Sequence, residues 1–161
     1  MNVFWQSLLV EHGKADFSIL LLIPGRLDQI QVVRAALAGV LDHICAEEDD
    51  VHSLGLAVTE ILNNSIEHGY GNGTTQQIET HFQVCGNDVQ IDIVDYAPPF
   101  PDEQRHRLAG ELVPLELPSE EWETRGHGLQ IVRHIVDSVV LESKDGFNRF
   151  TLRKRIHIRT G

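Results

Sequence analysis

The sequence has little cysteine, no long apolar run and a deficit of positive charge, and each shortage excludes a class of protein. Its 161 residues include two cysteines, Cys45 and Cys85, too few for a disulfide framework and without a CxxC metal motif. The longest uninterrupted apolar run is Ile19–Ile23, far short of the about 20 residues that a membrane-spanning helix needs. Met1–Val10 lacks a basic region and a long apolar stretch, so we expect no signal peptide and a cytoplasmic protein.

The charge balance argues against a direct contact with nucleic acid. Thirteen basic residues stand against 24 acidic ones, a formal net charge of −11, whereas a protein that binds phosphate backbones needs a basic face. An acidic protein can still meet basic partners or hold a metal–nucleotide complex locally. The length and the ordinary apolar content, 42%, predict a single globular domain over residues 1–161 with its own core.

The first half of the chain changes from strand periodicity to helical periodicity. Phe17–Ile23 has the length of a strand and is closed by Pro24 and a glycine. Apolar residues then recur at helical spacing from Leu27 to about Ile44, and again from Asp50 to His68. The acidic run Glu47–Asp50 is expected to be a loop that caps the second helix.

The second half is dominated by hairpins around one more helix. Its expected elements are strands Gln77–Cys85 and Val89–Val94, a helix Gly128–Asp137, and a hairpin of Val139–Ser143 with Phe147–Ile156. The stretch Pro98–Arg125 has weak periodicity and is expected to be a lid with a short helical piece at Asp102–Leu108. Helices and hairpins together predict an α+β two-layer sandwich: a mainly antiparallel, mixed sheet with helices on one face.

A polar stripe on the second helix is the first candidate site. Glu60, Asn64 and His68 are spaced by four residues, so they share one helix face. An amide oxygen is a hard ligand suited to Mg²⁺, and a carboxylate one turn away can orient or deprotonate a hydroxyl. A solvated helix surface explains the same stripe when it is taken alone.

The second candidate is Asp95, directly after a strand and before the Pro98-Pro99 turn. A carboxylate at the end of a buried strand can accept a hydrogen bond from an exocyclic amine, which would recognise adenine. The ordinary alternative is an aspartate that initiates a turn.

The third candidate is the run Arg125-Gly126-His127-Gly128-Leu129, which opens a helix. Glycines let the backbone approach a phosphate, and the free N–H groups of a helix start favour anions. Arg125 can pair with a terminal phosphate, or it is an ordinary surface cation. A lone GxG is a weak signal.

The order and spacing of these clusters resemble the GHKL (Bergerat) ATP-binding fold. Within that fold the sequence is most similar to the small anti-sigma-factor serine/threonine kinases of bacterial partner-switching systems. The family's three boxes correspond to Glu60–Tyr70, Asp95–Phe100 and Arg125–Ile131. The resemblance covers residues 17–156, nearly the whole chain.

The resemblance implies a role for each box residue. Asn64 would ligate Mg²⁺, Glu60 would be the catalytic base, and Asp95 would bind the adenine amine of ATP. Gly126 and Gly128 would support the phosphates, with Arg125 near the γ-phosphate. The other residues assigned to the nucleotide site are His68, Ala97, His127, Leu129 and, on a loose match in the final strand, Thr151.

The implied activity is phosphorylation of a STAS-domain antagonist, by a protein that also binds a sigma factor or similar target. A homodimer is suggested by the resemblance alone. Ala97 stands where the family usually has glycine, and the expected lid is acidic. These departures favour an alternative, a non-catalytic module that sequesters a regulatory partner under nucleotide control.

Overall fold

The fold is an antiparallel sheet with helices on one face. The computed structural model describes residues 16–69, 76–100, 108, 128–144 and 146–160. In chain order the elements are β1 (Phe17–Pro24), α2 (Ile30–His43), α3 (Glu48–Asn64), β2 (Gln77–Cys85), β3 (Asp88–Asp95), α5 (Gly128–Ile135), β4 (Ser138–Lys144) and β5 (Phe147–Arg155). A short 3₁₀ turn at Leu27–Gln29 precedes α2, and a π-helical turn at Ser65–Gly69 follows α3.

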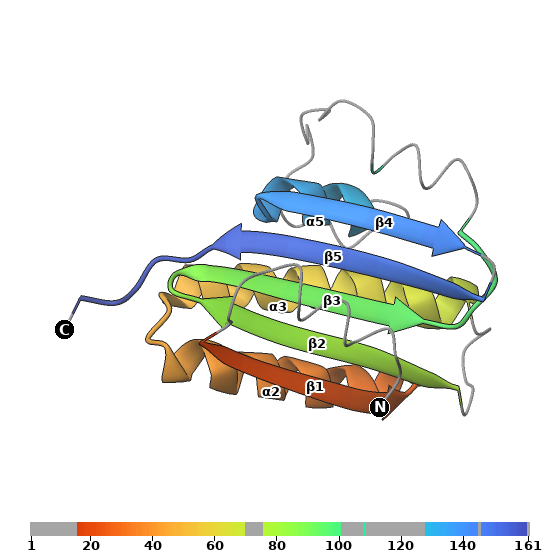
Figure 1. The fold of residues 1–161 in the computed structure, drawn as a ribbon, viewed down its shortest axis with the longest axis horizontal. Coiled ribbons are helices and arrows are strands. Elements are labelled where there is room, and N and C mark those ends of the chain that lie inside the picture. Colours follow the sequence, from red (N-terminus) through yellow and green to blue (C-terminus); the bar gives the residue numbers. More distant parts are fainter. Residues whose placement is uncertain (1–15, 70–75, 101–107, 109–127, 145, 161) are drawn as a thin grey trace.

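The described strands form one sheet in the order β1-β2-β3-β5-β4. The described helices α2, α3 and α5 all lie on the same side of it, with α3 packed against both α2 and α5 (Figure 1). This confirms the predicted α+β two-layer class. The expectation of a mixed sheet is wrong for the described residues, because every strand pair among them is antiparallel. None of the described helices combines the length and apolar character needed to cross a membrane.

The core forms because the apolar periods of helix and strand meet in one layer. The buried stripe of α2 is Ile30, Val33, Leu37, Val40 and Leu41, as its spacing predicts. On the sheet, Phe82, Ile91 and Leu152 stand side by side in the register and face this layer. The two hairpin turns contain glycines at positive φ, Gly86 at 56° and Gly146 at 101°, a backbone region that glycine enters at little cost.

The other face of the sheet is polar at its centre. His81, Asp92 and Thr151 stand in one row across β2, β3 and β5. Asp92 is fully buried and accepts hydrogen bonds from Thr151 Oγ1 (2.6 Å) and Gln90 Nε2 (2.8 Å). The two sides of β3 therefore differ in chemistry, and the direction in which a residue points decides which site it can join.

The expected loop at Glu47–Asp50 is instead the start of α3, which begins at Glu48. Asp50 is buried there and accepts hydrogen bonds from the His157 backbone N–H (2.6 Å) and its ring Nδ1 (3.0 Å), with Lys154 Nζ at 3.4 Å from its carboxylate. The neighbouring bridge between Ala46 and Ile158 runs beside this contact. Asp50 thus fastens the segment after β5 to the α2–α3 connection, a contact between distant parts of the chain.

Loss of the Asp50 carboxylate is expected to destabilise the protein. The Asp50→Ala substitution leaves the His157 N–H and the Lys154 ammonium without this acceptor. The free energy of unfolding should fall by about 1–3 kcal/mol, measured by urea denaturation at neutral pH. Asp49→Ala is the matched control, because Asp49 stands in the same first turn of α3 but is exposed. Equal losses in the two variants would contradict the assignment.

The stability difference between wild type and Asp50→Ala is expected to depend on pH. Burial raises the pKa of Asp50, but the hydrogen bonds from His157 and the charge of Lys154 outweigh burial, so the pKa is lowered overall. A lowered folded-state pKa stabilises the fold above the ordinary carboxyl pKa, and this contribution is lost as the pH falls through the lowered value. The stability difference between wild type and Asp50→Ala should therefore narrow in acid.

Candidate functional site

The first wall of the candidate site is the last turn of α3. Glu60 and Asn64 lie one turn apart, and Asn64 Nδ2 donates a 2.7 Å hydrogen bond to the Glu60 backbone oxygen. That bond uses the amide nitrogen, so the amide oxygen of Asn64 remains available to a ligand. A single amide oxygen suits Mg²⁺, which keeps most of its waters and takes few protein ligands. Within the described residues there is no cluster of three or more His, Cys, Asp or Glu that could hold a metal.

The start of α5 lies directly against this wall. A Cβ atom added to Gly128 would stand 2.2 Å from Glu60 Oε2 and 3.6 Å from Asn64 Nδ2. The position therefore tolerates no side chain while Glu60 keeps its conformation. The structure thus brings together two clusters that are far apart in the sequence, with the N-terminal end of a helix next to a carboxylate, a favourable arrangement of dipole and charge.

The second wall is formed around Asp95 at the end of β3. Its side chain is fully buried and faces the helices, and Oδ1 accepts hydrogen bonds from Asn148 Nδ2 (2.7 Å) and the Ala97 N–H (3.1 Å). Burial raises the pKa of Asp95, and the hydrogen bond from Asn148, the nearby Ser65 hydroxyl and the Ala97 N–H offset part of that rise. A buried, only partly compensated carboxylate is typical of a binding or catalytic site.

One oxygen of Asp95 is left for a ligand. In the described part of the chain, Asp95 Oδ2 and the neighbouring Ser65 Oγ are buried and make no hydrogen bond. Buried polar groups are rarely left in this state unless something else completes them. An acceptor on a carboxylate fits an amino donor, so the site passes a simple chemical test for an adenine ring.

The two walls are continuous because Asn64 and Ser65 are consecutive. The π-helical turn Ser65–Gly69 carries the chain from the Glu60 wall to the Asp95 wall. At its end Gly69 lies against Ala97: a Cβ on Gly69 would stand only 2.5 Å from the Ala97 Cβ. Ala97 is buried, and its methyl group is accommodated because residue 69 has no side chain. The close packing of these two residues thus depends on the absence of a side chain at Gly69.

The structure separates Thr151 from this site. Thr151 pairs with Asp92 in the register and donates its hydroxyl to that residue, on the polar face of the sheet. Asp95 points to the helix face, since side chains alternate along a strand. The expectation that Thr151 joins the adenine pocket is therefore wrong. Asn148, three residues earlier on β5, is the residue opposite Asp95, and it is absent from the site residues predicted from the sequence.

Several predicted residues cannot be located in the same way. Arg125, Gly126 and His127 lie outside the described residues, as does the side chain of His68. The expected lid, with its helical piece at Asp102–Leu108, is also outside them, apart from Pro98–Phe100 and Leu108. Leu129 is described and is 8% exposed, within the hydrophobic core, so its side chain supports the packing of α5.

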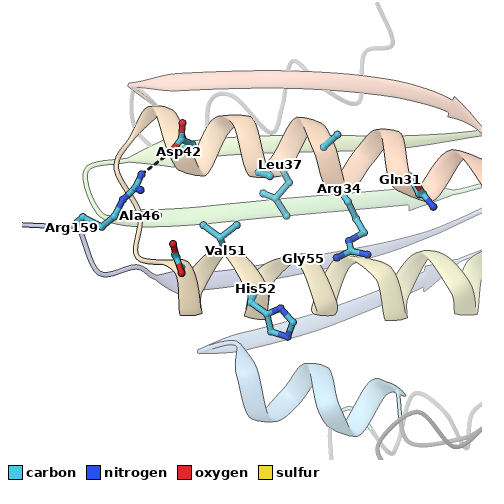
Figure 2. A pocket seen from close by; sticks show the side chains of 12 residues that line it. Gln31, Arg34, Leu37, Asp42, Ala46, Val51, His52, Gly55 and Arg159 are labelled. Atoms are coloured by element: carbon cyan, nitrogen blue, oxygen red, sulfur yellow. Dashed lines mark hydrogen bonds and ion pairs between the residues drawn. The ribbon is translucent and has the colours of Figure 1, made fainter. Parts of the chain in front are cut away.

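A separate hollow of about 780 Å³ lies between α2 and α3. Arg34, His52 and Gly55 line it, and the ion pair of Asp42 with Arg159 lies at one end (Figure 2). None of the predicted site residues lines this hollow. It is thus distinct from the walls around Glu60 and Asp95.

Comparisons with known proteins agree with this fold. Residues 23–154 match the family described as histidine kinase-like ATPase domain. The chain is 25% identical over 124 residues to the serine-protein kinase RsbW of Bacillus velezensis, covering 77% of each chain. It is 26% identical over 126 residues to an anti-sigma F factor of Clostridium botulinum, covering 78% of this chain and 85% of that one.

A solved structure supports the same fold. The crystal structure of RsbU and RsbW domains from a Mycobacterium tuberculosis protein superposes with a TM-score of 0.63 at 19% identity. The alignment covers 92% of this chain and 35% of that longer chain, so the present chain corresponds to about a third of it. At this identity the likeness concerns the fold alone.

Asp95 is expected to lower the stability of the unliganded protein at neutral pH. Its raised folded-state pKa means that stability falls as the pH rises from the ordinary carboxyl pKa through the raised value. Asp95→Asn does not titrate, keeps an oxygen for Asn148 and Ala97, and adds a donor near Ser65. It should raise the free energy of unfolding by about 0.5–2 kcal/mol at neutral pH, with the gain vanishing in acid.

The matched control is Asp92→Asn on the same strand. Asp92 already accepts hydrogen bonds on both carboxylate oxygens, so an amide there turns one acceptor into a donor and should destabilise the protein. Thermal melts of both variants across the pH range test the pair. Destabilisation by Asp95→Asn at neutral pH would contradict the raised folded-state pKa of Asp95.

Proposed function

The chain belongs to the histidine kinase-like ATPase family, and on this premise we propose that it is an ATP-dependent serine/threonine protein kinase that acts as an anti-sigma factor or an equivalent partner-switching regulator. The observation that carries the proposal is the juxtaposition of Glu60, Asn64 and the glycine that starts α5. The names of its relatives, serine-protein kinase and anti-sigma F factor, support the same activity.

Each described residue of the site has a role in this reaction. The Asp95 carboxylate accepts a hydrogen bond from the adenine amine, and Asn64 offers its amide oxygen to Mg²⁺ that accompanies the phosphates. The metal supplies neutralisation of phosphate charge. Backbone N–H groups at the start of α5, with Gly126 and Arg125 before it, bind the phosphate oxygens.

Glu60 is the proposed catalytic base. Its carboxylate accepts the proton of the substrate Ser or Thr hydroxyl as the oxygen forms its bond to the γ-phosphorus. The bond from that phosphorus to the bridging oxygen breaks, and ADP leaves with the bonding pair. The transferred phosphoryl group needs little covalent help, so positioning and charge neutralisation supply most of the rate.

The proposed substrate is a STAS-domain antagonist, and the proposed sequestered target is a sigma factor or a similar regulatory protein. A homodimer is proposed on the family resemblance alone. The alternative is a nucleotide-controlled binding module without transfer. Two departures from the family pattern motivate this alternative: Ala97 in place of the usual glycine, and the acidic residues of the expected lid.

Removal of the base tests the kinase proposal. With labelled ATP, Mg²⁺ and a candidate STAS-domain antagonist, Glu60→Gln should transfer phosphate about 10²–10⁴-fold more slowly than wild type, while ATP affinity by calorimetry stays within error. Glu67→Gln is the matched control, since Glu67 is exposed on the adjoining turn. ATP binding by wild type without any transfer would favour the binding module.

A second substitution tests the contact between the two clusters. In Gly128→Ala the new methyl group meets the flexible end of Glu60 at 2.2 Å and displaces its carboxylate. The transfer rate should fall by about tenfold or more, with little change in melting temperature. Gly39→Ala on α2 is the control, because a Cβ there meets nothing within 4 Å.

The double variant separates this effect from general damage. If Gly128→Ala acts through Glu60, adding it to Glu60→Gln should cause no further loss, because one interaction cannot be removed twice. A wild-type rate in Gly128→Ala, or additive losses in the double variant, would contradict the proposed contact.

A further inference from the structure

Asn148 occupies a position that the family resemblance did not assign. It stands directly opposite Asp95 in the register of β3 and β5, and its side chain has no exposed surface. An amide buried in this way is costly unless its oxygen and both N–H groups are used. The contacts of Asn148 therefore indicate what the residue does.

The carboxamide of Asn148 is fully engaged. Its nitrogen donates to Asp95 Oδ1 at 2.7 Å and also lies 3.2 Å from the Pro98 oxygen and 3.4 Å from the Ala97 oxygen. Its oxygen accepts from Ser143 Oγ at 2.6 Å and from the Phe100 N–H at 3.3 Å. This pattern fixes the amide orientation, with the nitrogen towards the carboxylate.

The consequence for Asp95 is an unequal pair of oxygens. Oδ1 accepts two hydrogen bonds, from Asn148 and Ala97. Oδ2 is buried and accepts none within the described part of the chain. The carboxylate can therefore rotate little, and it presents one acceptor to a ligand. The donor on Oδ1 also favours the charged form that burial opposes.

We infer that Asn148 is a positioning residue that sets base selectivity: it holds Asp95 so that Oδ2 accepts the 6-amino group of adenine. The inference rests on the proposed ATP-dependent function. A site whose buried acceptor is left unpaired rejects a ligand that lacks the matching donor. Purine nucleotides without a 6-amino group are thus bound more weakly, and this discrimination depends on the Asn148 side chain.

The test compares two nucleotides that differ at one group. Affinities for ATP and for purine riboside triphosphate, which lacks the 6-amino group, are measured with Mg²⁺ on the full chain by calorimetry. Wild type should prefer ATP. Asn148→Ala should lose about tenfold in ATP affinity and much less for the analogue, because the analogue never used Asp95 Oδ2. The preference for ATP should thus collapse.

Two further variants distinguish positioning from a structural role. Asn148→Leu has nearly the same shape but offers no donor to Asp95, so it too should lose the preference for ATP over the analogue. Ser143→Ala leaves the hydrogen bond between Asn148 and Asp95 in place, so this variant should keep the preference for ATP. A folded Asn148→Leu protein also covers the case in which Asn148→Ala fails to fold.

The outcomes separate this inference from the proposed function. Equal weakening of both nucleotides in the Asn148 variants, or an unchanged preference for ATP, overturns the inference while ATP binding by wild type stands. Failure of wild type to bind ATP overturns the proposed function, and the inference with it.

Discussion

The structure depends on a carboxylate that is buried with only half of its hydrogen bonds made. Asp95 is fully buried at the end of the central strand β3. Within the described residues, one of its oxygens accepts hydrogen bonds and the other accepts none. A fold selected for stability alone would place an amide or an apolar group there. Local conflict of this kind is expected where a protein keeps a group for a ligand.

The rest of the site is arranged around that constraint by one continuous segment. Helix α3 bears Glu60 and Asn64. The wider π-helical turn after it places Ser65 next to Asp95 and Gly69 next to Ala97. π-helical turns are frequent at functional sites, since they change which residues share a face. The change of winding lets a single helix serve both walls.

Much of this was predictable from local patterns. The stripe of α2, the alternation of β3 and the glycine turns are set by residues close in sequence, and the structure agrees with them. Glu60 and Asn64 share a face because of helical spacing alone. The contact of Gly128 with Glu60 is not local, and only the resemblance of ordered boxes anticipated it.

The errors arise where strand register decides the outcome. Whether Asn148 or Thr151 faces Asp95 depends on how β5 pairs with β3, and a slip of one residue exchanges the faces. Nothing in a single strand's sequence fixes this pairing. Likewise, Ala97 packs against Gly69, which lies on another element, and a hydrogen-bond donor to the buried Asp50 comes from a residue after β5.

The contact between Asp50 and His157 also bears on the order in which the molecule assembles. Its partners are separated by 107 positions, so the contact can form only after His157 has left the ribosome. Closing so long a loop loses much chain entropy and comes late relative to hairpins such as β2–β3. During synthesis, Asp50 at the start of α3 therefore lacks the hydrogen bonds that it accepts from His157 in the folded protein. The helical layer gains its full stability only once β5 and the residues after it have been made.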